Sequence, residues 1–189
     1  MHSGDCFLVP GPVRMSEACL QAMATPVMTA RGPEFRQVMA GLNSGLRYAF
    51  NLSPSKPEMK TQSWTGEDGY RVVVVSGSGT AAMEMVIANR FRRNDLVLVP
   101  TNGKFGERVA DICRQFCNVK HLNYEWGRSF DLYELEQQLE RGCYEALLIC
   151  HNETSTGITQ DAEAIAEMCE RHGVSFILDG ITSVGGMPV

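Results

Sequence analysis

Strand and helix patterns alternate along most of this chain, and this alternation is the feature that most limits the folds open to it. Short apolar runs typical of buried strands occur at 72–76, 96–101, 118–123, 145–150 and 175–180. The segments between them carry apolar residues at helical spacing. Strands that alternate with helices in this way predict an α/β fold, a mainly parallel sheet with helices on both faces. In such sheets, ligands bind beyond the carboxyl ends of the strands.

The residues before this alternation have a different pattern. Residues 1–51 predict an N-terminal arm and helices, with a short helix after an extended start and a longer one from Phe35 to Phe50. Residues 52–71 are polar and rich in Pro and Gly, which predicts a surface excursion. Residues 72–189 then form the α/β domain. The sequence thus predicts three parts, of which the last carries the sheet.

Composition argues against several classes of partner. The 189 residues are 44% apolar and carry 17 basic against 22 acidic side chains, a net charge of −5. No basic stripe is present, so nucleic acid is not expected as a partner. No window is long and apolar enough for a membrane span, and the first residues do not resemble a signal peptide. The seven scattered cysteines fit reduced core thiols in a cytoplasmic protein.

Three side chains of metal-binding types recur at intervals of four residues, at Cys113, Cys117 and His121. That spacing suits metal ligands on one helix face. However, Cys113 shares an apolar face with Val109 and Phe116, and His121 falls in a predicted strand. No fourth ligand is evident in the sequence. We therefore interpret these cysteines as core residues and expect no metal site.

A glycine-rich turn, Ser-Gly-Ser-Gly-Thr at 76–80, joins the first predicted strand to a helix. Such a turn typically binds an anion, because the free N–H groups and the dipole of the helix point at it. It is not a nucleotide P-loop, since Thr80 and Ala81 stand where that motif requires Lys and then Ser or Thr. It also lacks the third glycine of a dinucleotide motif and the glycines of a serine-hydrolase elbow. A structural turn without a ligand stays an alternative.

Two further strand ends carry polar residues. The segment His-Asn-Glu-Thr-Ser-Thr-Gly at 151–157 follows one strand, and it is either a polar turn or a set of ligand-binding groups. Asp179 ends another apolar strand, where an aspartate is usually a helix cap, a metal ligand or a counter-charge for a cationic ligand. Since no clustered metal ligands lie nearby, the counter-charge is favoured. Together the three strand ends predict one ligand with a phosphate and a protonated nitrogen, which fits pyridoxal phosphate.

Six sequence blocks resemble the class V aminotransferases of fold type I, in that family's order and near its spacing from about Phe7 to the last residue. The blocks are LVPGPVRM, ARGPEF, SGSGTAAMEM, TNGKFGERVADI, HNETSTGI and LDGITSVGG. Within the family, the resemblance is strongest to the alanine–glyoxylate, serine–pyruvate and archaeal aspartate aminotransferases. It implies the fold of the pyridoxal 5′-phosphate-dependent transferases and a homodimer.

The resemblance also implies roles for individual residues around the cofactor. Ser78, Gly79 and Thr80 would bind its phosphate with backbone and side-chain groups. Phe105 would stack on one face of the pyridine ring, and Ile181 would pack against the other face. Each of these residues occupies the matching position of its block.

The same resemblance assigns three further contacts. Thr154 would bond the ring hydroxyl, and Asp179 would pair with the pyridinium nitrogen, which keeps the ring an electron acceptor. Gly11, in the Pro-Gly-Pro arm, would make a backbone contact near the substrate carboxylate. The implied activity moves an amino group from a small amino acid, such as alanine, serine or aspartate, to a 2-oxo acid such as glyoxylate or pyruvate.

One departure from the family pattern concerns the catalytic lysine. The family's Schiff-base lysine follows the aspartate segment, and its position is matched by none of Lys56, Lys60, Lys104 and Lys120. The small C-terminal domain and the arginine that binds the substrate carboxylate are also unmatched. We therefore expect an N-terminal portion of such an enzyme, inactive on its own. The alternatives are a naturally truncated, non-catalytic relative that binds cofactor or a subunit, and a phosphate-ester or nucleotide-binding domain, which leaves Asp179 unexplained.

Overall fold

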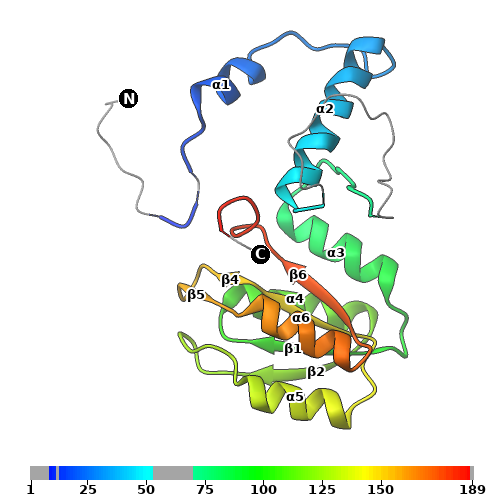
Figure 1. Ribbon diagram of the computed structural model, residues 1–189, viewed down its shortest axis with the longest axis vertical. Coiled ribbons are helices and arrows are strands. Elements are labelled where there is room, and N and C mark those ends of the chain that lie inside the picture. The colour runs from blue at the N-terminus through cyan, green and yellow to red at the C-terminus, as the bar shows by residue number, and fades with distance from the viewer. Residues whose placement is uncertain (1–8, 12, 53–69, 188–189) are drawn as a thin grey trace. The chain divides into compact units, whose positions relative to one another are not determined.

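The computed structural model describes residues 9–11, 13–52 and 70–187 of a chain that divides into two compact units, Met1–Val72 and Val73–Val189 (Figure 1). In the first unit, α1 (Glu17–Met23) starts after Ser16, whose Oγ accepts a hydrogen bond of 3.3 Å from the N–H of Cys19. α2 (Pro33–Ala49) has proline at its first position, where an N–H has no helical partner to lose. These are the short and the long helix that the sequence predicts. No helix in the described residues is long and apolar enough to cross a membrane.

The predicted division of the chain at residues 51 and 71 stays a prediction. The polar segment 52–71 falls largely at 53–69, which lies outside the described residues. Where the described chain resumes, the Arg47 guanidinium near the end of α2 donates a hydrogen bond of 2.9 Å to the carbonyl of Tyr70. This contact brings the end of α2 close to residue 70 within the first unit.

The second unit holds the predicted parallel sheet. Its strands are β1 (Leu96–Thr101), β2 (Asn118–Asn123), β3 (Ala146–Cys150) and β6 (Ser175–Asp179). Within residues 73–187 they lie in the order β2-β1-β3-β6, and each neighbouring pair is parallel. Parallel pairs need crossover connections, which are the helices α4 (Lys104–Phe116), α5 (Leu132–Arg141) and α6 (Ala162–Arg171). α3 (Gly79–Arg90) precedes β1, and a small antiparallel hairpin of β4 (Asn152–Glu153) and β5 (Ile158–Thr159) follows β3.

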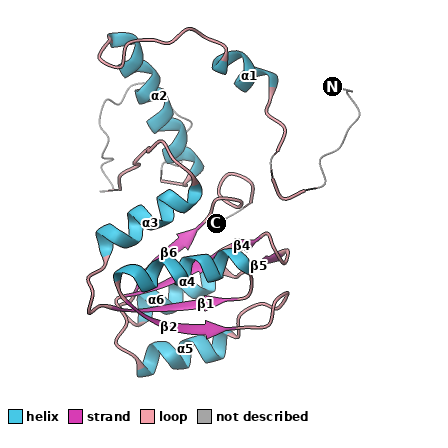
Figure 2. Ribbon diagram, turned by 180° about the vertical axis from the view of Figure 1, so that it is seen from behind, coloured by secondary structure: helices cyan, strands magenta, loops and turns pink. Residues whose placement is uncertain are grey.

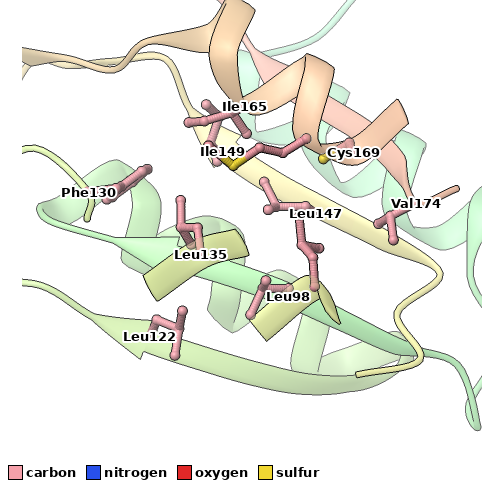
Figure 3. Packing of buried hydrophobic residues seen from close by; sticks show 11 residues of the cluster. Leu98, Leu122, Phe130, Leu135, Leu147, Ile149, Ile165, Cys169 and Val174 are labelled. Carbon is pink, nitrogen blue, oxygen red and sulfur yellow. The ribbon is translucent and has the colours of Figure 1, made fainter. Parts of the chain in front are cut away.

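Alternate side chains of the strands fill two layers of core. Val97 and Val99 of β1 pack with residues of α3 and α4, whereas Leu98 between them packs with residues of α5 and α6 (Figure 3). All three are fully buried, and burying a side chain of this size contributes about 1.5–3 kcal/mol. Figures 1 and 2, drawn from opposite sides, show α6 and α4 on opposite faces of the sheet. The predicted α/β fold, a mainly parallel sheet with helices on both faces, is confirmed.

The prediction of a buried strand at 72–76 is wrong. No strand of the described residues pairs with this segment, and Val73, Val74 and Val75 are 70%, 46% and 55% exposed. β-branched side chains favour a strand because they fit a pleated, half-buried surface, and that surface exists only beside a hydrogen-bonded neighbour. The sequence pattern shows that the valines favour a β-strand, but it does not show whether a neighbouring strand is there to pair with them.

Candidate functional site

The start of α3 offers the hydrogen-bond donors of a typical anion site. The Ser78 Oγ accepts a hydrogen bond of 3.2 Å from the N–H of Ala81, so Ser78 caps the helix. Gly79 and Thr80 lie in the first turn, where backbone N–H groups have no carbonyl partner within the helix. Ser78 is exposed, and Gly79 and Thr80 are half-buried. The predicted turn and helix start are thus present, although the strand before them is not.

The loop after β6 lies directly against this helix start. A Cβ atom added at Gly79 would stand 2.5 Å from the Cδ1 of Ile181. A larger residue at Gly79 would displace only the end of the Ile181 side chain, which is 65% exposed and has room to move. Ile181 and Gly79 are about one hundred residues apart in sequence, and the fold brings these two predicted site residues into contact.

Asp179 is the last residue of β6, and one of its carboxylate oxygens has no partner. Its Oδ1 accepts a hydrogen bond of 3.1 Å from the N–H of Ile181. Its Oδ2 is buried without a hydrogen-bond partner among the described residues. Burial raises the pKa of the Asp179 carboxyl, the Ile181 N–H lowers it and the nearby Glu153 charge raises it. An unpaired buried acceptor is costly unless a donor meets it, so this oxygen marks a place for an N–H or a cation.

Phe105 lies in the first turn of α4 and is half-buried. One turn later, the Arg108 guanidinium carbon lies 5.1 Å from the centre of the Phe105 ring. The Arg108 Nη1 also donates a hydrogen bond of 3.2 Å to the Oγ1 of Thr80. Arg108 thus connects the predicted stacking ring to the predicted phosphate-binding turn. Arg108 is not among the site residues that the sequence predicts.

Glu153 holds the start of α4 and is fully buried. Its Oε2 accepts hydrogen bonds from the N–H groups of Phe105 at 3.0 Å and Gly106 at 2.9 Å. Its Oε1 accepts from the N–H and the hydroxyl of Ser155, at 3.2 and 2.6 Å. Sequence reasoning missed this residue, because the helix that it caps begins almost fifty residues earlier in the chain.

Gly103, just before α4, gives Glu153 the space that it occupies. A Cβ atom at Gly103 would lie 2.3 Å from the Cγ and 2.5 Å from the Cδ of Glu153. The backbone of Gly103 is extended, so its requirement is space and not an unusual dihedral angle. A glycine before a helix that lacks its own capping side chain is the signal that would have pointed to a remote cap.

The β4–β5 hairpin at 152–159 contains most of the polar segment predicted at 151–157, and it contacts both the start of α4 and the loop after β6. Thr154 is half-buried in its turn, directly after Glu153. The Thr182 hydroxyl lies 3.2 Å from the carbonyl oxygen and 3.1 Å from the Oδ1 of Asn152, which links the hairpin to the loop after Asp179. The predicted groups after β3 and at the end of β6 therefore lie together at the carboxyl edge of the sheet. Gly11 is exposed in the other unit, and its predicted role stays a prediction.

Comparison with known proteins decides the family. The model of the family "Aminotransferase class-V" matches residues 49–189. The chain belongs to the class-V aminotransferases. The resemblance drawn from the six sequence blocks is thereby confirmed.

Individual class-V aminotransferases and other relatives match nearly the whole chain. It is 29% identical to the (S)-ureidoglycine–glyoxylate transaminase of Bacillus subtilis, over 97% of this chain and 41% of that protein. It is 32% identical to the soluble hydrogenase 42 kDa subunit of Anabaena cylindrica, over 97% and 45%. A crystal structure of alanine–glyoxylate aminotransferase from Nostoc sp. is 33% identical, with a TM-score of 0.82 over all of this chain and 48% of that one. The chain spans somewhat less than half the length of these relatives.

The cysteines of this class-V aminotransferase chain lie mainly in its core. Cys113 is fully buried beside Val109, and burial raises the pKa of its thiol to about 12. His121 is bonded to the Thr101 hydroxyl at 2.8 Å and to the Arg114 guanidinium at 3.1 Å. The interpretation of Cys113 and Cys117 as core residues is confirmed. Across residues 9–11, 13–52 and 70–187, no group of three or more His, Cys, Asp or Glu side chains is placed to hold a metal ion.

Proposed function

We propose that this chain is the cofactor-binding N-terminal portion of a pyridoxal-phosphate-dependent aminotransferase. The whole protein would move an amino group from a small amino acid, such as alanine, serine or aspartate, to a 2-oxo acid such as glyoxylate or pyruvate. Family membership and relatives named for glyoxylate support this reaction. The observation that carries the proposal is the buried, unpaired Oδ2 of Asp179 at the carboxyl end of the sheet.

Asp179 suits the ring nitrogen of the cofactor. A protonated pyridine N–H would supply the donor that Oδ2 lacks, and its positive charge would favour the ionised carboxylate that burial disfavours. When bound, pyridoxal phosphate supplies an electron-accepting ring and a carbon that carries the amino group between the two substrates. The role of Asp179 would be to hold the proton on the ring nitrogen.

The remaining groups suit the rest of the same ligand. The first turn of α3, with Ser78, Gly79 and Thr80, would bind the phosphate through N–H groups, hydroxyls and the helix dipole. Phe105 and Ile181 would flank the ring and exclude water from it. The Thr154 hydroxyl would bond the ring oxygen. Glu153 would hold the backbone of Phe105 so that its ring keeps a fixed place.

We also propose that the chain is inactive alone, because no lysine matches the family's catalytic position. A coding sequence that continues past Val189 and soon supplies a lysine would support a fragment of a working enzyme. A stop codon directly after Val189 would instead favour a non-catalytic relative.

We also propose that the protein is a homodimer and that it is cytoplasmic. Free cysteines, such as the buried Cys150 and Cys169, support the cytoplasmic location.

Binding of pyridoxamine 5′-phosphate to the chain tests the cofactor site directly. This amine form cannot form imines with surface lysines such as Lys104, so calorimetry would report the site alone. We expect Asp179→Asn to weaken binding by about tenfold or more, since a charged hydrogen bond is lost. Asp161→Asn is the matched control, because Asp161 caps α6 through a 3.0 Å bond to Ala164 and lies outside the predicted site. Equal affinity of wild type and Asp179→Asn would contradict the proposal.

A further inference from the structure

Arg108 contacts two parts of the proposed cofactor site, the phosphate-binding turn and the stacking ring, although it is not among the residues assigned to that site above. Its guanidinium donates to the Thr80 Oγ1 at 3.2 Å, and the same group lies 5.1 Å from the centre of the Phe105 ring. Thr80 is in the first turn of α3, and Phe105 is in the first turn of α4. One side chain therefore contacts both the turn that would bind phosphate and the ring that would stack.

The hydrogen bond restricts the direction in which the Thr80 hydroxyl proton can point. A hydroxyl has one proton to donate and two lone pairs. Because its oxygen accepts from Arg108, the proton of Thr80 points elsewhere and is available to another acceptor. A cationic donor also polarises the O–H bond, which strengthens the bond that the hydroxyl gives. The arrangement favours an anionic acceptor, such as a phosphate oxygen, at Thr80.

The Arg108 guanidinium covers one face of the Phe105 ring. A guanidinium over an aromatic face is held by the electrostatic quadrupole of the ring. With Arg108 on one face of Phe105, an aromatic ligand would stack on the opposite face. Arg108 thus contacts one residue of the predicted phosphate site and the predicted stacking ring, although it belongs to neither predicted set.

We infer that Arg108 is a positioning residue of the proposed cofactor site, which directs the Thr80 hydroxyl at the phosphate and holds the Phe105 ring. This inference rests on the proposed function. Because Arg108 acts on the phosphate through Thr80, its loss should reduce the preference for a phosphorylated ligand over the same ligand without phosphate. A residue that only stabilises the fold would change both affinities alike.

The test compares two ligands, pyridoxamine 5′-phosphate and pyridoxamine, by calorimetry on the full 189-residue chain. We expect Arg108→Met to lower the affinity ratio of phosphorylated to unphosphorylated ligand by about fivefold, the value of one typical hydrogen bond. Arg114→Met is the matched control, since Arg114 lies on the same helix but contacts Asp111 and His121. The control should keep the wild-type ratio.

A double-mutant cycle with Thr80→Val tests whether Arg108 works through Thr80. Thr80→Val keeps the shape of the side chain and removes the hydroxyl. When Arg108→Met is added to Thr80→Val, we expect it to change the affinity ratio less than twofold. The Thr80 hydroxyl, through which Arg108 would act, is already absent in that background. Full additivity of the two ratio changes would overturn the inference. If Arg108→Met does not fold, Arg108→Lys replaces it, because lysine keeps the positive charge but lacks the planar guanidinium that contacts both Thr80 and Phe105; it should also lower the ratio.

Two outcomes separate this inference from the proposed function. If wild type prefers the phosphorylated ligand and Arg108→Met retains that preference in full, the role of Arg108 is overturned and the cofactor site stands. If wild type binds neither ligand, the cofactor site and the role of Arg108 both fail. A reduced ratio in Arg108→Met with an unchanged ratio in Arg114→Met supports the inference.

Discussion

Helices α4 and α5 begin in different ways, although both follow a strand of the same sheet. α5 is capped locally by Asp131, whose Oδ1 accepts from the N–H groups of Tyr133 at 3.0 Å and Glu134 at 3.1 Å. α4 has no side-chain cap of its own, and the remote, buried Glu153 binds two of its first N–H groups instead. The local cap stabilises a helix. The remote cap also fixes the position of Phe105 relative to the hairpin that carries Thr154.

The largest effect that this comparison predicts is that of Glu153→Ala. The change leaves the N–H groups of Phe105 and Gly106, and the N–H and hydroxyl of Ser155, without their acceptor, so the free energy of unfolding should fall by about 3–5 kcal/mol. Urea unfolding would measure this loss. Pyridoxamine 5′-phosphate should also bind more weakly, since Phe105 loses its anchor. If Glu153→Ala lowers the free energy of unfolding no more than removal of the local cap of α5 does, the distinction between the two helix starts is wrong.

Gly103→Ala should have the next largest effect. The added methyl group would need space that Glu153 occupies, so the free energy of unfolding should fall by about 1–3 kcal/mol, as for other overpacked sites. The control is Gly45→Ala in the interior of α2, where nothing lies within 4 Å of the added atom. That control should be neutral or stabilising by about 0.5–1 kcal/mol. Equal results at the two glycines would contradict the packing of Glu153 against Gly103.

Asp131→Ala should have a smaller and purely structural effect. Loss of a local helix cap costs about 1 kcal/mol of unfolding free energy. Because α5 carries none of the predicted site residues, the affinity for pyridoxamine 5′-phosphate should not change. Parallel unfolding and binding measurements on Asp131→Ala and Glu153→Ala would sharpen the comparison. A clear loss of binding in Asp131→Ala would show that the start of α5 matters for the site after all.

We expect the smallest effect on the free energy of unfolding at Asp179. Both carboxylate oxygens of Glu153 accept hydrogen bonds, whereas the Oδ2 of Asp179 is buried without a partner among the described residues. Burial raises the pKa of the Asp179 carboxyl, so the folded chain without ligand holds a proton there to a higher pH than the unfolded chain does. The free energy of unfolding should therefore fall as the pH rises from about 4 through the folded pKa of this group. Asp179→Asn should be more stable than wild type at pH 7, and the difference should shrink as the pH falls toward 4. A variant less stable than wild type at pH 7 would contradict this.

Local pattern explains which parts of the molecule the sequence predicts. The strands at 96–101 and 118–123 have the predicted bounds, because consecutive apolar or alternating residues are a local signal. The start of α5 is a local signal of the same kind, since Asp131 stands directly before the helix that it caps. Asp179 was identified because it ends an apolar strand.

Long-range contact explains what the sequence does not predict. The valines at 72–76 have the composition of a strand, but strand formation needs a neighbour that composition does not specify. Glu153 was overlooked within a polar segment, since nothing near it in sequence shows that it caps α4. Arg108 was also missed, because its two contacts depend on how α3 and α4 pack. The cofactor and substrate roles of all the predicted site residues, Thr154 and Gly11 included, stay predictions.

The central claim is that Asp179 holds a proton on the ring nitrogen of a bound cofactor. Pyridoxamine 5′-phosphate labelled with ¹⁵N in its ring would report that proton directly by NMR when bound to the chain. We predict a protonated ring nitrogen in wild type to a higher pH than in the free ligand, and loss of that shift in Asp179→Asn. A bound ring nitrogen that titrates as it does in free solution would contradict the claim.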